Sequence, residues 1–207
     1  MKENLQEKFI YIFHKYSDDK NLEAELWKEI ELNYSHKSRH YHNLLHLEHM
    51  ITELEPLKIE ISDWDSLLFS VFYHDIVYKS TAKDNEEKSA EVAKKRLEKL
   101  NLQPDQIQKI VHQIIATKSH QKSNDQDINY LLDADLAVLG KSWSAYEIYI
   151  KQIRKEYAIY PDFLYNPGRK KVLKNFLTFD TIYKTDCFKN RYEVQARDNI
   201  KREIELL

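Results

Sequence analysis

The sequence has only two glycines, four prolines and one cysteine among its 207 residues. Hairpin turns and glycine-rich phosphate-binding loops need glycine at positions of positive φ, and two glycines can hardly supply them. Neither the dinucleotide-binding pattern Gly-x-Gly-x-x-Gly nor the P-loop pattern is present, so both of these nucleotide-binding classes are excluded. Helices need little glycine, and the composition therefore predicts an all-α protein.

The single cysteine, Cys187, excludes an internal disulfide and is typical of a protein from a reducing compartment. No apolar run approaches the ~20 residues that span a bilayer, and the N-terminal stretch carries acidic residues from its third position, unlike a signal peptide. Charges of both signs are interspersed, with a net charge of −2, so nucleic-acid binding is not expected. We expect a cytoplasmic protein that does not associate with membranes.

The spacing of apolar residues predicts helices along the chain. Between Trp64 and Phe72, apolar side chains recur every three or four positions, which indicates a helix over about 62–75 with Ser62 as its cap. Further helices are predicted at about 4–16, 22–36, 41–55, 127–139, 142–159, 169–184 and 189–205.

Two more helices are indicated by the residues at their N-termini. Asp84 is predicted to cap one of them, with Glu87 at the capping-box position, and Pro104 is predicted to start the next. The polar segment 119–127 is predicted to be a loop. The segment 160–169 holds two prolines and one glycine, and it is predicted to interrupt the helices. No repeat or low-complexity linker is found, so we expect a single domain.

Four of the nine histidines lie within RHYHNLLHLEHM, residues 39–50. On a helix, His42 and His46 would lie one turn apart on the same face, and two imidazoles at that spacing can share a metal ion. The zinc-protease motif His-Glu-x-x-His is excluded, because Asn43 stands where its catalytic glutamate would be. By itself, the spacing of His42 and His46 is only a weak indication of a metal site. No chemistry is assigned to the neighbouring His36, His40 and His49.

Ionisable residues recur inside two apolar segments further along the chain. FYHDIVY (72–78) places His74 and Asp75 side by side at the end of an apolar helix, and LLDADLAVLG (131–140) places Asp135 beside an apolar face. Burying such groups is costly unless they are paired or bound to a metal ion. Each acid alone is explained by a helix cap or a buried ion pair, but the combination of His, His-Asp and Asp favours a metal site.

The segments RHYHNLLH, YHDIVY, NEEKSA and DADLAVLG together resemble motifs of the HD superfamily of metal-dependent phosphohydrolases, in particular a bacterial group predicted to have that activity. The likeness covers about residues 39–140 and continues through FLTFDTIY (176–183) and ARDNI (196–200). It implies a single HD-type helical bundle over residues 1–207. The helices of about 141–207 would pack on the motif core, and further helices would precede it.

The resemblance also implies roles for individual residues. The metal ligands would be His46, His74, Asp75 and Asp135. Asp75 would also be the carboxylate that can bridge to a second ion, which gives it a catalytic role. The Tyr-His-Asn-x-x-His segment is similar to that of cyclic-nucleotide phosphodiesterases, in which the earlier histidine is a general acid, and here that residue is His42. No purine-clamping glutamine like theirs is identified, so cyclic nucleotides are not the favoured substrates.

Two imidazoles and two carboxylates suit Mn²⁺, Fe²⁺, Co²⁺, Ni²⁺ or Zn²⁺, and Mg²⁺ is a further candidate. One or two ions per chain are expected. Such an ion lowers the pKa of a bound water from about 16 towards about 7, and the resulting hydroxide can attack phosphorus while His42 protonates the leaving group. The predicted function is hydrolysis of a phosphate ester of a nucleotide or other small molecule. Phosphomonoesterase, phosphodiesterase and pyrophosphohydrolase activities are not distinguished.

Four more residues are candidates for binding the substrate or a second ion, namely Glu86, His112, Lys118 and His120. For the last three, the alternative is the polar end of a helix, and for His112 that alternative is favoured. Glu86 lies at a helix start, where a capping role is the alternative.

Two other functions are compatible with the sequence. Some HD-fold proteins are di-iron oxygenases, and His112 and His120 could complete a second iron site. A non-catalytic ligand-binding or regulatory HD domain is the third hypothesis, although the presence of all four ligand types together with His42 argues against it. The expected partner is a small-molecule phosphate ester, and an oligomer is compatible with the sequence.

Overall fold

The computed structural model describes residues 4–207, and over that range it consists of ten α-helices and two short 3-10 helices, without a strand. The prediction of an all-α fold is therefore confirmed. No helix in this range is both long enough and apolar enough to cross a membrane.

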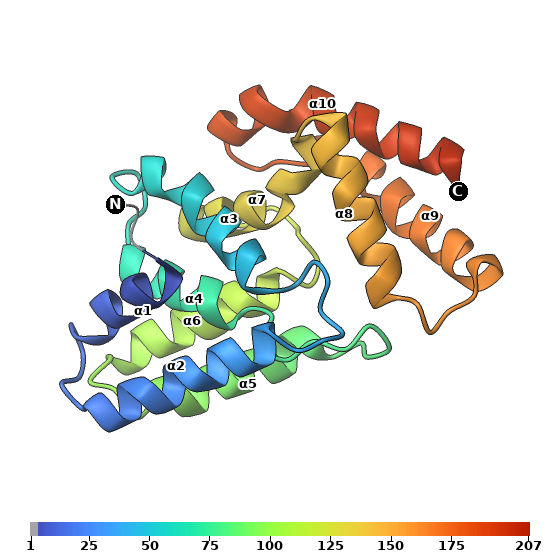
Figure 1. Ribbon diagram of the computed structural model, residues 1–207. Coiled ribbons are helices and arrows are strands. Elements are labelled where there is room, and N and C mark those ends of the chain that lie inside the picture. Colours follow the sequence, from blue (N-terminus) through green and yellow to red (C-terminus); the bar gives the residue numbers. More distant parts are fainter. Residues whose placement is uncertain (1–3) are drawn as a thin grey trace.

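The helices form two groups along the sequence. The first comprises α1 (Leu5–Phe13), α2 (Lys20–Tyr34), α3 (Leu44–Leu54), α4 (Trp64–Tyr73), α5 (Asn85–Leu97), α6 (Pro104–Ala116) and α7 (Gln126–Asp135). The second comprises α8 (Trp143–Glu156), α9 (Asp162–Thr178) and α10 (Asp186–Leu206). The 3-10 helices are η1 (Glu55–Leu57) and η2 (Leu136–Gly140). In Figure 1 the helices of the first group pack together, and those of the second group lie along one side of them.

The first group is built around α4, whose side chains are buried on every face. Helix α6 packs against both α4 and α5, and α3 packs against α7. Edge-to-face contact of the Phe9 and Phe72 rings, with centroids 5.3 Å apart, joins α1 to α4. Helix α4 also contacts α3 and α7, so the start of α3 lies close to the C-terminal ends of α4 and α7.

Several helix starts follow the local sequence, although two of the predicted capping residues do not act as expected. Asp84 is the N-cap of α5 and Pro104 is the first residue of α6, as predicted. The N-cap of α4 is Asp63 rather than Ser62, because the Asp63 carboxylate accepts a hydrogen bond from the backbone N–H of Ser66 at 3.0 Å. Glu87 does not complete a capping box, since its carboxylate pairs with Lys118 instead.

The helix predicted over 41–55 begins later, at Leu44. Asn43 is its N-cap, and the Asn43 side-chain oxygen accepts a hydrogen bond from the backbone N–H of Leu45 at 3.0 Å. A capping asparagine has extended rather than helical backbone, so the helix cannot include the residues before it. His42 therefore lies ahead of the helix, and the prediction that His42 and His46 share one helical face is wrong.

The predicted break before the C-terminal helices is present but earlier and shorter than 160–169, because α8 ends at Glu156 and α9 already begins at Asp162. Pro167 removes one backbone hydrogen bond inside this helix, at a solvent-exposed position where water can satisfy the freed carbonyl. On the opposite side Tyr165 and Leu173 are buried, and their packing supports the helix across the proline. Burial on one face thus outweighs a local helix breaker.

The helix predicted to reach residue 184 instead ends at Thr178. Beyond it, the backbone N–H groups of Ile182 and Tyr183 donate to the carboxylate of Glu193 at 3.0 and 3.1 Å. Those of the next two residues, Lys184 and Thr185, donate to Asp133 at 2.7 and 2.8 Å. Because side chains take these donors, the segment does not need a helix to satisfy its backbone.

Helix α10 lies against η2, which directly follows the apolar end of α7. The Asn199 side chain donates to the carbonyls of Leu139 and Lys141, each at 2.8 Å. Gly140 faces Tyr192 so closely that a Cβ atom at Gly140 would lie 2.5 Å from the Tyr192 Cβ atom. Only glycine permits this approach of the two segments.

We predict opposite effects for alanine at the two glycines. Gly140→Ala should lower stability by about 1–3 kcal/mol through overpacking, which lowers the Tm by about 3–10 °C for a chain of this size. Gly168→Ala should raise stability by about 0.5–1 kcal/mol, because Gly168 lies within α9 with open space around it. Thermal unfolding of both variants provides the measurement. Equal Tm values for the two would contradict the close packing of η2 on α10.

Candidate metal centre

Three predicted ligands meet where α3 begins and α4 ends. His46 lies in the first turn of α3, His74 is the C-cap of α4, and Asp75 follows it. One ligand atom from each lies within 4.8 Å of the others. The Nε2 atoms of His46 and His74 are 3.2 Å apart, and Asp75 Oδ2 lies 3.3 Å from His74 Nε2. This buried His-His-Asp group can hold a metal ion.

The fourth predicted ligand, Asp135, is the last residue of α7 and lies beside this group. Its Oδ1 atom is 3.1 Å from His46 Nε2 and 3.9 Å from His74 Nε2. Its Oδ2 atom accepts a hydrogen bond from His120 Nε2 at 2.9 Å. The structure thus brings all four predicted ligands together, with His120 in contact with one of them.

The arrangement of donor atoms fits a divalent metal ion. His74 Nδ1 lies 2.8 Å from the carbonyl oxygen of Val71, to which it can only donate, so the Nε2 atom carries the available lone pair. That nitrogen faces the Nε2 atom of His46 and two carboxylates. Metal–ligand bonds of about 2.0–2.2 Å place neighbouring donors about 3–3.5 Å apart, which agrees with the shorter separations here.

Charge compensation dominates the electrostatics of the group. Burial alone would raise the pKa of Asp75, but the adjacent His74 holds it well below its usual range. Burial alone would lower the pKa of His74, and the carboxylates of Asp75 and Asp135 raise it to about 9. Burial lowers the pKa of His46. The carboxylates of Asp75 and Asp135 therefore lie beside two imidazoles of different character. His46 favours the neutral form, and His74 favours the protonated form as long as no metal ion is bound.

The backbone around the group is held by Arg39, a buried side chain. Its guanidinium donates to the carbonyl oxygens of Asp75 and Ile76 at 2.6 and 2.9 Å, and to that of His42 at 3.3 Å. The ring of Tyr34 lies against the Arg39 guanidinium, and its hydroxyl accepts a hydrogen bond from the backbone N–H of Asp75 at 3.1 Å. Arg39 thus joins the His42 segment to the end of α4.

His42 is positioned by Glu156, a residue that the sequence analysis did not identify. Glu156 Oε2 accepts a hydrogen bond from His42 Nδ1 at 2.6 Å, and Oε1 accepts the backbone N–H groups of His40, Tyr41 and His42. The Tyr78 ring stacks on the His42 ring at a centroid distance of 4.1 Å. His42 Nε2 lies 4.0 Å from Asp75 Oδ2.

Burial alone would lower the pKa of His42, but the hydrogen bond to Glu156 and the charges of Asp75 and Glu156 outweigh it and raise the pKa. The same contacts lower the pKa of Glu156 to about 2. Glu156 continues the buried stripe of α8 formed by Tyr146, Tyr149 and Ile153. An acid on an otherwise apolar helical stripe was the sequence signal that could have revealed it.

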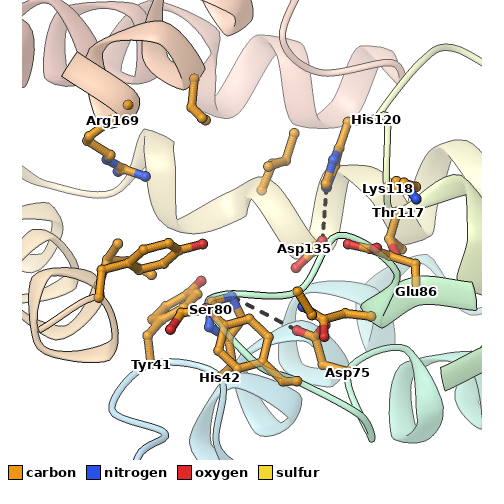
Figure 2. A pocket seen from close by; sticks show the side chains of 18 of the residues that line it. Tyr41, His42, Asp75, Ser80, Glu86, Thr117, Lys118, His120, Asp135 and Arg169 are labelled. Carbon is orange, nitrogen blue, oxygen red and sulfur yellow. Dashed lines mark hydrogen bonds and ion pairs between the residues drawn. The ribbon is translucent and has the colours of Figure 1, made fainter. Parts of the chain in front are cut away.

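A cleft of about 680 Å³ opens beside the candidate metal centre. Figure 2 shows Asp75, Glu86, His120 and Asp135 at one end of it, and Arg169 across the cleft. The other residues of the site that line it are His42, His74 and Lys118.

The remaining candidate residues divide between the cleft and the surface. Glu86 is partly buried in the cleft wall, and this burial raises the pKa of its carboxyl. Lys118 lies at the rim, where its ammonium pairs with Glu87. His112 is exposed on α6, hydrogen-bonded to Gln108, and does not line the cleft. The interpretation of His112 as a polar helix residue therefore agrees with its position.

His120 adopts a left-handed backbone conformation with a φ of 51°. Histidine is one of the residue types that tolerate this region, although glycine is favoured there. The conformation follows the end of α6, where the His120 N–H donates to the carbonyl of Ala116. The ring is thereby turned to Asp135.

No protein-family model, curated protein or solved structure matches the chain. The motif resemblance to HD phosphohydrolases therefore stays a prediction, and the chemistry of the site is inferred from its own geometry.

We predict that metal binding depends on His46 and Asp135 but not on His112. The wild-type chain, titrated calorimetrically with Mn²⁺ or Zn²⁺, should bind at least one ion. At a free metal concentration of about 100 times the Kd, binding should stabilise the fold by about 2.7 kcal/mol, which raises the Tm by about 5–10 °C. His46→Ala and Asp135→Ala should abolish both effects. His112→Ala is the matched control, and equal loss of binding in all three variants would contradict the site.

Proposed function

We propose that this chain is a metal-dependent phosphohydrolase of the HD type, which cleaves a phosphate ester of a nucleotide or other small molecule. The observation that carries the proposal is the convergence of His46, His74 and Asp75, with Asp135 beside them, next to a large cleft. A divalent ion bound there would supply an activated water and offset negative charge on phosphoryl oxygens. The single cysteine supports a cytoplasmic setting for this activity.

His42 is the proposed proton donor to the leaving group. Its Nδ1 atom is engaged by Glu156, which leaves Nε2 as the nitrogen that can reach a substrate in the cleft. Because Nε2 lies 4.0 Å from Asp75 Oδ2, a phosphate held at the metal centre can bring its leaving oxygen near this nitrogen. Protonation of the leaving alkoxide is the step that His42 would assist.

The groups on the other flank have supporting roles in this proposal. His120 holds Asp135 Oδ2, which leaves Oδ1 turned to His46, so His120 is a positioning residue. Glu86 lines the same part of the cleft and can accept a proton from the attacking water. Lys118 at the rim is exposed to solvent and paired with the carboxylate of Glu87, so it attracts an anionic substrate only weakly.

A di-iron oxygenase is the second candidate, and one observation favours it. His120 contacts Asp135, and Glu86 lines the cleft nearby, so nitrogen and oxygen ligands for a second ion are at hand. Turnover that requires dioxygen and releases no phosphate would support this activity. If this chain binds metal but hydrolyses no phosphate ester, the result would support the third hypothesis, a non-catalytic regulatory domain.

We predict that His42→Ala keeps the metal and loses turnover. With metal supplied, kcat on an alkyl phosphate ester should fall about 10²–10⁴-fold, because general-acid assistance is lost. The loss should be smallest for p-nitrophenyl phosphate, whose leaving group needs no proton. Steady-state kinetics and metal content are measured on the same samples. If the variant binds no metal, His42 is a ligand and not the proton donor.

We predict that Glu156→Gln reproduces this pattern in weaker form. The amide keeps an oxygen for the backbone N–H groups of residues 40–42 but removes the negative charge that favours protonated His42. The kcat for alkyl esters should fall about 10-fold, while the kcat for p-nitrophenyl phosphate should change little. Equal losses for both substrates would indicate that Glu156 has only a structural role.

A further inference from the structure

The cleft has a second end that the proposed reaction does not use. It extends from the candidate metal centre towards α8 and α9, and Figure 2 shows Arg169 there, across the cleft from Asp75 and Asp135. At about 680 Å³, the cleft is large enough for a whole small molecule rather than a phosphate group alone. The side chains at this end are mainly aromatic, namely Tyr149, Tyr157, Tyr160 and Tyr165.

Arg169 is held at this end by Glu203. Its Nε atom donates to Glu203 Oε1 at 2.7 Å and its Nη2 atom donates to Oε2 at 3.1 Å, and the arginine side chain is only 9% exposed. Because the carboxylate offsets the guanidinium charge, this end of the cleft is not suited to a second phosphate. The third nitrogen, Nη1, has no hydrogen-bond partner among residues 4–207. It can donate to an uncharged acceptor on a ligand.

One phenol group adds a further donor to the same end. The hydroxyl of Tyr149 accepts a hydrogen bond from Arg169 Nη2 at 3.2 Å, so its own hydrogen is free to be donated. The hydroxyl of Tyr165 does not add to these donors, because it is enclosed by protein atoms and has almost no accessible surface. The donors that a ligand in the cleft can reach at this end are therefore Arg169 and Tyr149.

The aromatic rings offer flat apolar surface beside these donors. The ring of Tyr157 lies 6.0 Å from that of Tyr165 at 52°, and 6.2 Å from that of Tyr160 at 32°. Planar aromatic ligands are stabilised by contact with such rings. A ligand that is flat and carries several acceptors matches both features.

We propose that this end of the cleft binds the base of a nucleotide whose phosphate lies at the candidate metal centre, with Arg169 and Tyr149 donating to its acceptors. A wall rich in donors favours bases that carry carbonyl oxygens, such as uracil or hypoxanthine, over adenine, which presents an amino group. A sugar or alkyl group lacks a flat face that carries several acceptors. The proposal deepens the proposed phosphohydrolase function and rests on it for the position of the phosphate.

Nucleoside binding tests the base site without any turnover. Calorimetry of the metal-loaded chain should detect uridine and inosine, with Kd values about 10-fold lower than that for adenosine. Ribose should show no binding at the same concentrations. Binding of ribose as tight as that of the nucleosides would overturn the proposal.

Tyr149→Phe and Tyr73→Phe form a matched pair of variants. Each removes one hydroxyl from a buried tyrosine, but Tyr73 lies in the core on α4 and does not line the cleft. Tyr149→Phe should raise the Kd for uridine about 3–10-fold, and Tyr73→Phe should leave it unchanged. Arg169→Lys keeps a charge for Glu203 but loses the planar fork, and should raise that Kd about 10-fold. Equal Kd values for the two phenylalanine variants would contradict the proposal.

Kinetics then separate the base site from the hydrolytic site. Tyr149→Phe should raise KM for uridine monophosphate with kcat retained, and should leave both constants for ribose 5-phosphate unchanged. Equal changes for the two substrates would overturn the base site and leave the phosphohydrolase function standing. Nucleoside binding without phosphate release from either substrate would overturn the phosphohydrolase function and leave the base site standing.

Discussion

Two carboxylates, Asp75 and Asp135, are buried against the rings of His46 and His74, and the arrangement of the surrounding helices depends on keeping them there. Taking such charges out of water costs free energy unless opposite charge, hydrogen bonds or a metal ion compensates. The compensation is concentrated where α3, α4 and α7 begin or end, because side chains at helix termini can converge on one point. Arg39 adds to it by tying together the backbone carbonyls around this point.

Glu156 makes the second group of helices part of the site. From the end of α8 it binds three successive backbone N–H groups at residues 40–42 and the ring of His42. The same helix carries Tyr149, whose hydroxyl contacts Arg169 in the far wall of the cleft. One helix therefore orients the proposed proton donor and shapes the surface on which the proposed base would lie. Helix α8 thus contributes contacts at both ends of the cleft.

Local signals predicted most of the helices, and they failed where distant residues decided the backbone. The helix start at Pro104 and the cap at Asp84 follow from rules that involve only neighbours in sequence. The helix through Pro167 does not, because its stability comes from burial of the opposite face. The late start of α3 depended on choosing between competing local signals, and the cap at Asn43 outweighed the histidine spacing.

The sequence by itself determined the all-α fold, because composition and helical periodicity are properties of residue type and short spacing. It named the four side chains that meet at the candidate metal centre only through the resemblance of its motifs to those of HD phosphohydrolases. Only the tertiary structure decided that Glu156 orients His42 and that Arg169 faces a donor-rich aromatic cleft. These contacts join residues 34 to 114 positions apart, and no local pattern specifies which distant partner a side chain will meet. Packing of whole helices fixes those pairings.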